Sequence, residues 1–196
     1  MSDKRFKRFE FAAPFVVFLL ASLLHFIYDL VPSVLTALLG AVNESIWEHM
    51  KIFSIAFVFY GVVEYLWLRP ELKRFVAAKV AGLFVQLAVI PLVYYGYTLF
   101  AKGPVLWVDL IIGFMAAVLG TVVSSRLYKG DREIEKYFYT ALLTLCLLLI
   151  MILCFTYFPP ETELFRDVVT GTYGITSEEL DMGAFAMEKT RSTDIF

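Results

Sequence analysis

The stretch Tyr137–Phe158, YFYTALLTLCLLLIMILCFTYF, decides the fold class of this chain. It contains no charged side chain, and leucine and other apolar residues fill its centre. A helix needs about 20 such residues to cross the roughly 30 Å hydrocarbon core of a lipid bilayer. The stretch therefore predicts a membrane-spanning helix.

Four further stretches have the length and apolar character of a membrane span. The composition of the whole chain agrees, because 60% of its 196 residues are apolar and 18% are charged. Soluble domains have about 45–50% apolar and about 25% charged residues. The sequence predicts an all-α polytopic membrane helix bundle of about five transmembrane helices. The other expected spans are residues 11–30, 45–68, 75–100 and 105–127.

A shorter apolar segment, Val31–Val42, lies between the first two spans. It is too short to cross a membrane. Pro32 opens it, Ser33 can cap a helix and Gly40 can end one. We expect a short interfacial or re-entrant helix on the non-cytoplasmic side.

The basic residues are distributed unevenly among the connections between spans. They gather in residues 4–8, 69–74 and 126–136, and five spans place all three segments on the same side. Positive charge favours the cytoplasmic side of a membrane protein. We expect a multi-pass protein of the cell membrane with a cytoplasmic N-terminus. Residues 1–158 would form the transmembrane domain, and residues 159–196 an extracytoplasmic tail.

Ionisable side chains inside spans are costly and are by default candidates for function. His25 and Asp29 lie toward the outer end of the first span, and Asp109 lies at the outer start of the fourth. The segment Asn43–Lys51, NESIWEHMK, opens the second span on the same side. Both histidines of the chain and several carboxylates are therefore expected near one leaflet.

These residues suggest a metal site. His25 and His49 would bind Zn²⁺ or another divalent metal, with Asp29 and Asp109 as further candidate ligands. Glu44 and Glu48 are the candidate catalytic carboxylates, one completing the metal shell or acting as general base on an activated water. The spacing matches no diagnostic metal motif.

A purely structural interpretation also fits the same residues. Asn43 can cap the second span and Glu44 suits the positive end of its dipole. Glu44, Glu48 and Lys51 would then share one stripe of the helix, with His49 about 100° away from Glu48. In the same interpretation His25 and Asp29 touch one turn apart, and Glu64 extends toward the lipid headgroups.

The motif Asn43–His49, NESIWEH, resembles that of a family of small, uncharacterised prokaryotic membrane proteins. The segment Leu164–Ile175, LFRDVVTGTYGI, is similar to the closing segment of the same family. The resemblance covers essentially the whole chain and implies a polytopic membrane protein without an established activity. A looser likeness to intramembrane CAAX-type glutamate proteases lacks their paired-glutamate-then-arginine motif.

Three function classes remain open from the sequence. The first is an intramembrane hydrolase, metal-dependent or not, of a lipid or a membrane peptide. The second is a small carrier or an ion- or proton-coupled transporter, in which polar residues such as Gln86 and Glu64 continue to the inner face. The third is a non-catalytic subunit of a membrane complex, in which Arg166 and Asp167 pair with the cluster. The lipid bilayer is the expected partner, nucleic acid is not, and the oligomeric state is not readable.

Overall fold

The computed structural model describes residues 3–101 and 103–175. The described part is helical and contains no strand beyond one isolated bridge between Arg166 and Tyr173. The helices are α1 Asp3–Leu30, α2 Val34–Leu39, α3 Ile46–Leu68, α4 Leu72–Thr98, α5 Leu106–Lys129, η1 Glu135–Tyr137 and α6 Phe138–Tyr157.

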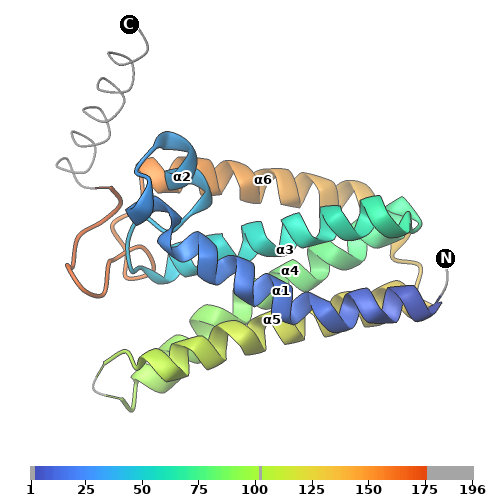
Figure 1. Cartoon of the computed structure of the whole chain (residues 1–196), viewed down its shortest axis with the longest axis horizontal. Coiled ribbons are helices and arrows are strands. Elements are labelled where there is room, and N and C mark those ends of the chain that lie inside the picture. The colour runs from blue at the N-terminus through green and yellow to red at the C-terminus, as the bar shows by residue number, and fades with distance from the viewer. Residues whose placement is uncertain (1–2, 102, 176–196) are drawn as a thin grey trace, which may run out of the picture.

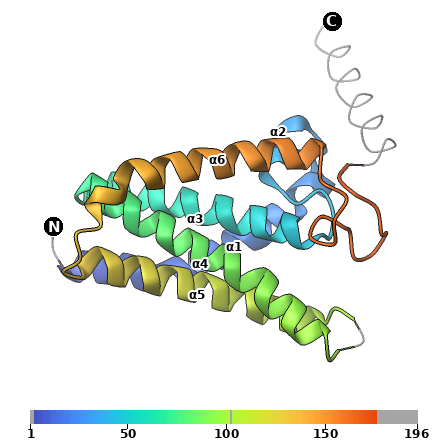
Figure 2. The same ribbon diagram turned by 180° about the vertical axis from the view of Figure 1, so that it is seen from behind.

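The predicted all-α bundle is confirmed. Five helices are long and apolar enough to cross a membrane, namely α1, α3, α4, α5 and α6. They run alongside one another, with α5 and α6 at opposite edges of the bundle (Figures 1 and 2). Many large apolar side chains face outward, as a lipid environment requires. The chain is therefore a multi-pass membrane protein.

The short helix α2 forms where Ser33 and Gly40 predicted it. The Ser33 side chain accepts a hydrogen bond from the Thr36 backbone N–H, and Thr36 Oγ1 accepts one from the Ser33 N–H. This reciprocal capping box satisfies donors at the helix start. Gly40 then ends the helix.

Helix α1 is longer than the expected span, because it continues through the basic residues 4–8. The apolar run of residues 11–30 indicates only the part of α1 that lies in lipid. The backbone is helical for eight further residues on the N-terminal side. At this end the Arg74 guanidinium donates to the Leu127, Tyr128 and Gly130 carbonyls and pairs with Glu135 at 2.9 Å. The contacts join the start of α4 to the end of α5.

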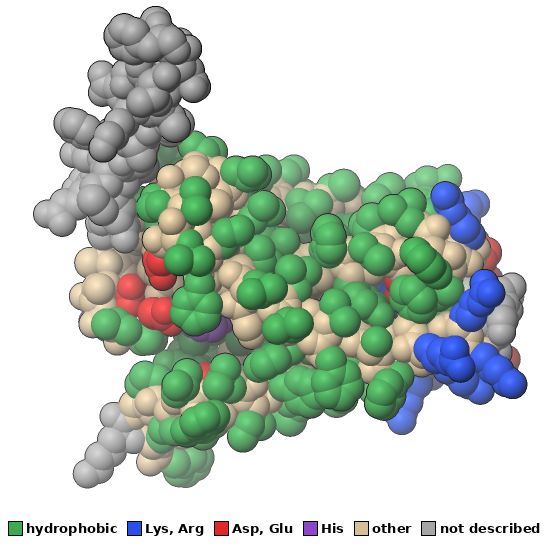
Figure 3. All heavy atoms as spheres, viewed as in Figure 1, with side chains coloured by type: hydrophobic (Ala, Val, Ile, Leu, Met, Phe, Trp, Pro, Cys, Tyr) green, Lys and Arg blue, Asp and Glu red, His purple; other side chains and the backbone are tan. Residues whose placement is uncertain are grey.

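Lys and Arg side chains gather at this end of the molecule, where α1, α4 and α6 begin (Figure 3). We call it the basic end, and call the opposite end, which carries His25 and His49, the histidine end. The segregation follows from the helix order, because α3 and α5 finish where the other three start.

Helices α4 and α5 cross in close contact at two glycines. A Cβ on Gly82 would lie 2.4 Å from the Gly120 carbonyl oxygen, and one on Gly120 would lie 2.8 Å from the Gly82 carbonyl oxygen. Small residues allow such backbone approach, which supplies much of the packing energy between membrane helices. The crossing fixes α5 against the bundle.

Aromatic side chains fill the middle of the bundle between α1, α3 and α5. Phe18 contacts Phe53 and Phe114, with ring centroids 6.2 and 5.7 Å apart. The Phe53 ring also rests on the α5 backbone, since a Cβ on Gly113 would lie 2.5 Å from its Cζ. This aromatic layer separates the polar residues at the histidine end from those nearer the basic end.

The segment 159–175 folds over the histidine end. Phe165 is buried against Trp47 and Phe155, with ring centroids 4.9 and 5.2 Å apart. The Trp47 backbone N–H donates to the Leu164 carbonyl at 2.9 Å. The expected tail beyond residue 175 lies outside the described residues.

Candidate metal centre

His25, Glu44 and His49 meet at the histidine end of the bundle. Glu44 Oε1 lies 3.6 Å from His25 Nε2, and Glu44 Oε2 lies 3.7 Å from His49 Nε2. The ligand atoms that the three residues offer all lie within 4.8 Å of one another. The expected convergence of both histidines with a carboxylate is therefore present in the structure.

The spacing of these atoms suits a small cation. Separations of 3.6 and 3.7 Å are too long for direct hydrogen bonds. Ligands about 2.0–2.1 Å from a tetrahedral zinc ion lie about 3.3 Å from one another. The two distances involve different oxygens of Glu44. With one ligand atom from each residue, the three atoms lie within 4.8 Å of one another, so they would have to approach by up to about 1.5 Å to hold the ion. The set of two imidazoles and one carboxylate is one that zinc enzymes use.

The His49 ring is held in the orientation that a metal ligand needs. Its Nδ1 lies 2.8 Å from the Ser45 carbonyl oxygen. A carbonyl only accepts hydrogen bonds, so Nδ1 carries a proton, and Nε2 is the ring nitrogen that lies toward Glu44. Metal-bound histidines are commonly fixed in this way by a hydrogen bond to the second ring nitrogen.

Glu44 reaches the histidines because it lies in a turn before α3. The N-cap of α3 is Ser45, whose side chain accepts from the Glu48 backbone N–H, so the prediction that Asn43 caps the helix is wrong. The Asn43 side chain accepts from the Ser45 N–H instead. Glu44 is therefore off the helical stripe that it was expected to share with Glu48 and Lys51.

Glycine at position 40 lets the chain return close to α1 just before this turn. A Cβ there would lie 2.4 Å from Ile27 Cγ2 and 2.7 Å from the Leu24 carbonyl oxygen. The Ala41 N–H also donates to the Leu24 carbonyl at 3.4 Å. These contacts hold the turn that carries Glu44 beside His25.

Comparison with known protein families bears on this turn and on the closing segment. Residues 2–175 match the model of a family described as a family of unknown function, DUF6512. The chain belongs to the DUF6512 family. Comparisons with curated proteins and with solved structures give no match. The expected membership of an uncharacterised family is confirmed.

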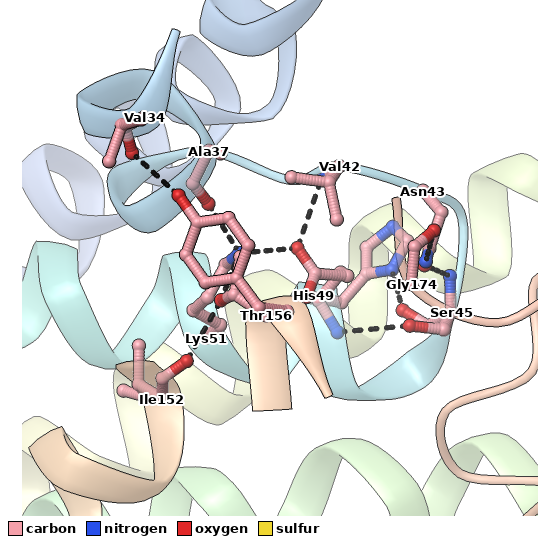
Figure 4. A network of polar contacts seen from close by, with 12 residues as sticks. Val34, Ala37, Val42, Asn43, Ser45, His49, Lys51, Ile152, Thr156 and Gly174 are labelled. Atoms are coloured by element: carbon pink, nitrogen blue, oxygen red, sulfur yellow. Dashed lines mark hydrogen bonds and ion pairs between the residues drawn. The ribbon is translucent and has the colours of Figure 1, made fainter. Parts of the chain in front are cut away.

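In this DUF6512 protein, Glu48 lies apart from the two histidines. Glu48 Oε2 is 2.6 Å from Lys51 Nζ and accepts from the Val42 N–H at 2.9 Å. Lys51 also donates to the Ala37 carbonyl and to Thr156 Oγ1, as Figure 4 shows, whereas His49 lies beside Ser45. The ion pair has side-chain exposures of 2% and 0% and joins α2, α3 and α6.

The two expected aspartates differ in their relation to the centre. Asp109 accepts a hydrogen bond from the Tyr97 hydroxyl at 2.7 Å and interacts electrostatically with His49. Asp29 is exposed and belongs to no cluster with the histidines among the described residues. Neither aspartate belongs to the cluster of His25, Glu44 and His49, and Asp109 interacts with His49 electrostatically.

The closing segment, residues 159–175, contributes contacts to this turn, and one of them involves Asp167, which the non-catalytic interpretation of the sequence had placed with the cluster. Asp167 Oδ2 lies 3.5 Å from the Glu44 backbone nitrogen, and the Gly174 carbonyl accepts from the Asn43 side chain at 3.2 Å. Arg166 pairs with Glu163 instead of joining the cluster. The contact between Asn43 and Gly174 joins residues 131 positions apart, and no local sequence pattern predicts it.

The histidine side chains lie in a hollow of the molecular surface at this end (Figure 3). A separate pocket of about 480 Å³ adjoins the site between α4 and the closing segment. Asp167 belongs to its lining and also contacts the Glu44 backbone. Other lining residues are Ile46, Tyr94, Tyr95, Thr98 and Arg166.

Proposed function

We propose that this protein is a metal-dependent membrane hydrolase with Zn²⁺ or a similar divalent ion at His25, Glu44 and His49. The observation that carries the proposal is the approach of three ligand atoms from three chain segments to within 4.8 Å of one another. Catalytic zinc sites typically have three protein ligands and an open fourth position.

The ion would supply a nucleophile, since zinc lowers the pKa of a bound water to about 7. We assign the general-base role to Asp109, because it is a carboxylate besides Glu44 that interacts electrostatically with His49. Water adds to the carbonyl carbon of an ester or amide, and Asp109 takes one proton. The bond to the alcohol or amine then breaks as that leaving group receives the proton.

Glu48 was the second candidate catalytic carboxylate. Its bonds to Lys51 and to the Val42 N–H support a structural role instead, since both occupy the same carboxylate oxygen. Asp29, the other aspartate expected as a ligand, is exposed and outside the cluster, so the proposal does not include it among the ligands. The surrounding apolar surface supports a lipid or a membrane peptide as the substrate class.

Metal analysis of purified protein in lipid nanodiscs tests the proposal. We expect one equivalent of zinc and a zinc-dependent release of lysolipid, fatty acid or peptide fragments, measured by mass spectrometry. His49→Ala should lose both zinc and turnover. Asp109→Asn should keep zinc and lose turnover by about 100-fold or more, the usual contribution of a general base.

Asp29→Asn is the matched control, because it removes an exposed carboxylate from the same end and should keep zinc and turnover. Absence of zinc after gentle purification and after added ZnCl₂ would refute the metal centre. Stoichiometric zinc without cleavage of any lipid or peptide supplied would refute the hydrolase.

We also propose that the basic end is cytoplasmic, with residues 1–158 as the transmembrane domain and residues 159–196 outside the cell membrane. The support is the gathering of Lys and Arg at one end (Figure 3). In a cysteine-free background, Glu161→Cys should react with a membrane-impermeant maleimide on intact cells. Glu133→Cys should react only after permeabilisation, and the reverse pattern would overturn the orientation.

A carrier is the second candidate. Glu64, toward the basic end of α3, and Gln86, near the middle of α4, are fully buried, which favours a polar route. The aromatic layer of Phe18, Phe53 and Phe114 interrupts that route. Saturable zinc flux into proteoliposomes, abolished by His25→Ala, would establish the carrier, whereas zinc-dependent turnover without flux would exclude it.

A further inference from the structure

Three charged side chains meet between the aromatic layer and the basic end. Lys79 Nζ lies 2.9 Å from Glu10 Oε1 and 2.6 Å from Glu64 Oε2. The three side chains are 11%, 7% and 0% exposed and come from α4, α1 and α3. The expectation that Glu64 extends toward the headgroups is therefore wrong, because Lys79 holds it inside the bundle.

The charges of this group do not balance when every member is ionised. Among the described residues, Glu10 and Glu64 have no ion-pair partner other than Lys79. Two carboxylates and one ammonium leave one negative charge uncompensated. Such a charge is very costly inside a membrane protein, where buried groups neutralise instead.

Among the residues that the structure describes, no second Lys, Arg or His forms an ion pair with Glu10 or Glu64. The Tyr60 hydroxyl of α3 donates to the Phe9 carbonyl at 2.6 Å and is thereby occupied. The apolar groove that Lys79 adjoins is lined by residues of α3, α4 and α6, with Tyr65 as its other titratable side chain. On α5, the nearby Ser124 is buried and uncharged.

Glu10 Oε2 and both carboxyl oxygens of Glu64 are buried without a hydrogen bond, and of the three only Glu64 Oε2 has the Lys79 ammonium beside it. The Glu10 and Glu64 carboxyl groups are neighbours, because Glu10 Oε1 and Glu64 Oε2 contact the same Lys79 Nζ. A proton on either carboxyl supplies the missing donor and removes the excess charge at the same time.

We propose that Glu10 and Glu64 share one proton, so that Glu10, Glu64 and Lys79 form an electroneutral proton-binding site. The site lies on the far side of the aromatic layer from His25 and His49. It is independent of the metal centre and of the proposed hydrolase.

Infrared spectroscopy of the protein in lipid tests this site. At neutral pH we expect a carbonyl-stretching band of a protonated carboxylic acid that shifts in heavy water. Glu64→Gln should abolish the band, because Glu10 and Lys79 then form a neutral pair. Glu10→Gln should abolish it for the same reason. Lys79→Met should strengthen it, because both carboxyls then need a proton.

Glu133→Gln is the control, since it removes an exposed carboxyl at the basic end and should leave the band unchanged. Circular dichroism and thermal denaturation verify that each variant is folded. A folded wild-type protein without the band would overturn the proposal. So would a band that persists in both glutamine variants, or one that sodium removes relative to choline, since a bound cation would then neutralise the site.

Discussion

The imidazole rings of His25 and His49 lie edge to face with their centroids 5.1 Å apart, although they belong to α1 and α3. Glu44 approaches both rings from the turn between α2 and α3. The proposed metal ion would account for this close approach of the two histidines, because ionisable side chains inside membrane spans are candidates for function.

Replacing either histidine should therefore weaken zinc binding. We expect His25→Ala and His49→Ala each to lower the affinity by at least about 100-fold, since even outer partners of metal ligands contribute 10–100-fold. Isothermal titration calorimetry of the protein in nanodiscs measures the zinc affinity of each variant. Equal affinity in wild type and in both variants would place the metal elsewhere.

The buried pair of Glu48 and Lys51 should stabilise the fold. Lys51→Met leaves a buried carboxylate unpaired, and breaking a buried pair in this way costs about 3–5 kcal/mol. The free energy of unfolding, measured by SDS titration, should fall accordingly. The double variant Glu48→Gln/Lys51→Met should recover part of the loss. A single variant as stable as wild type would show that the pair contributes little.

The crossing of α4 and α5 should depend on Gly82. In Gly82→Ala the added methyl would lie 2.4 Å from the Gly120 carbonyl oxygen and 2.8 Å from Ser124 Cβ. The helices must separate, at a cost of about 1–3 kcal/mol. Gly96→Ala is the matched control on the same helix, because nothing lies within 4 Å of its added Cβ. Thermal denaturation should distinguish the two variants.

Phe165 should hold the closing segment in place. Phe165→Ala removes the ring that packs on Trp47 and Phe155, a loss of about 3–5 kcal/mol. Trypsin should then cleave faster after Arg166. Zinc affinity should also fall, because Asp167 no longer supports the Glu44 turn. Val169→Ala, at an exposed position of the same segment, should leave both unchanged.

Most of the fold was predictable because lipid imposes a simple rule on sequence. The apolar lengths gave five spans whose helices begin and end within three residues of the expected bounds, except at the start of α1. Ser33 and Gly40 marked α2 by their capping chemistry. Span length and capping residues are local features of the sequence, so they can be recognised without knowledge of the tertiary structure.

The site was only partly predictable because its geometry depends on non-local contacts. The position of each residue along its span correctly placed His25 and His49 at one end of the bundle. Which carboxylates face them depends on where each side chain points, and the sequence does not give that direction. Glu44 lies outside α3 because Ser45 is the N-cap of the helix, and Glu48 pairs with Lys51 instead of facing the histidines. The pairing of Lys79 with Glu10 joins residues 69 positions apart, and no spacing rule reports it.

The aromatic layer of Phe18, Phe53 and Phe114 has a consequence for the membrane that contains this protein. The contacts of Phe18 with Phe53 and Phe114 place packed rings between α1, α3 and α5, and a hydrated ion does not pass between packed rings. Cells that overproduce the protein should keep their membrane potential. Phe53→Ala removes the ring that packs on the α5 backbone at Gly113. Cells that overproduce this variant should lose membrane potential through an ion leak.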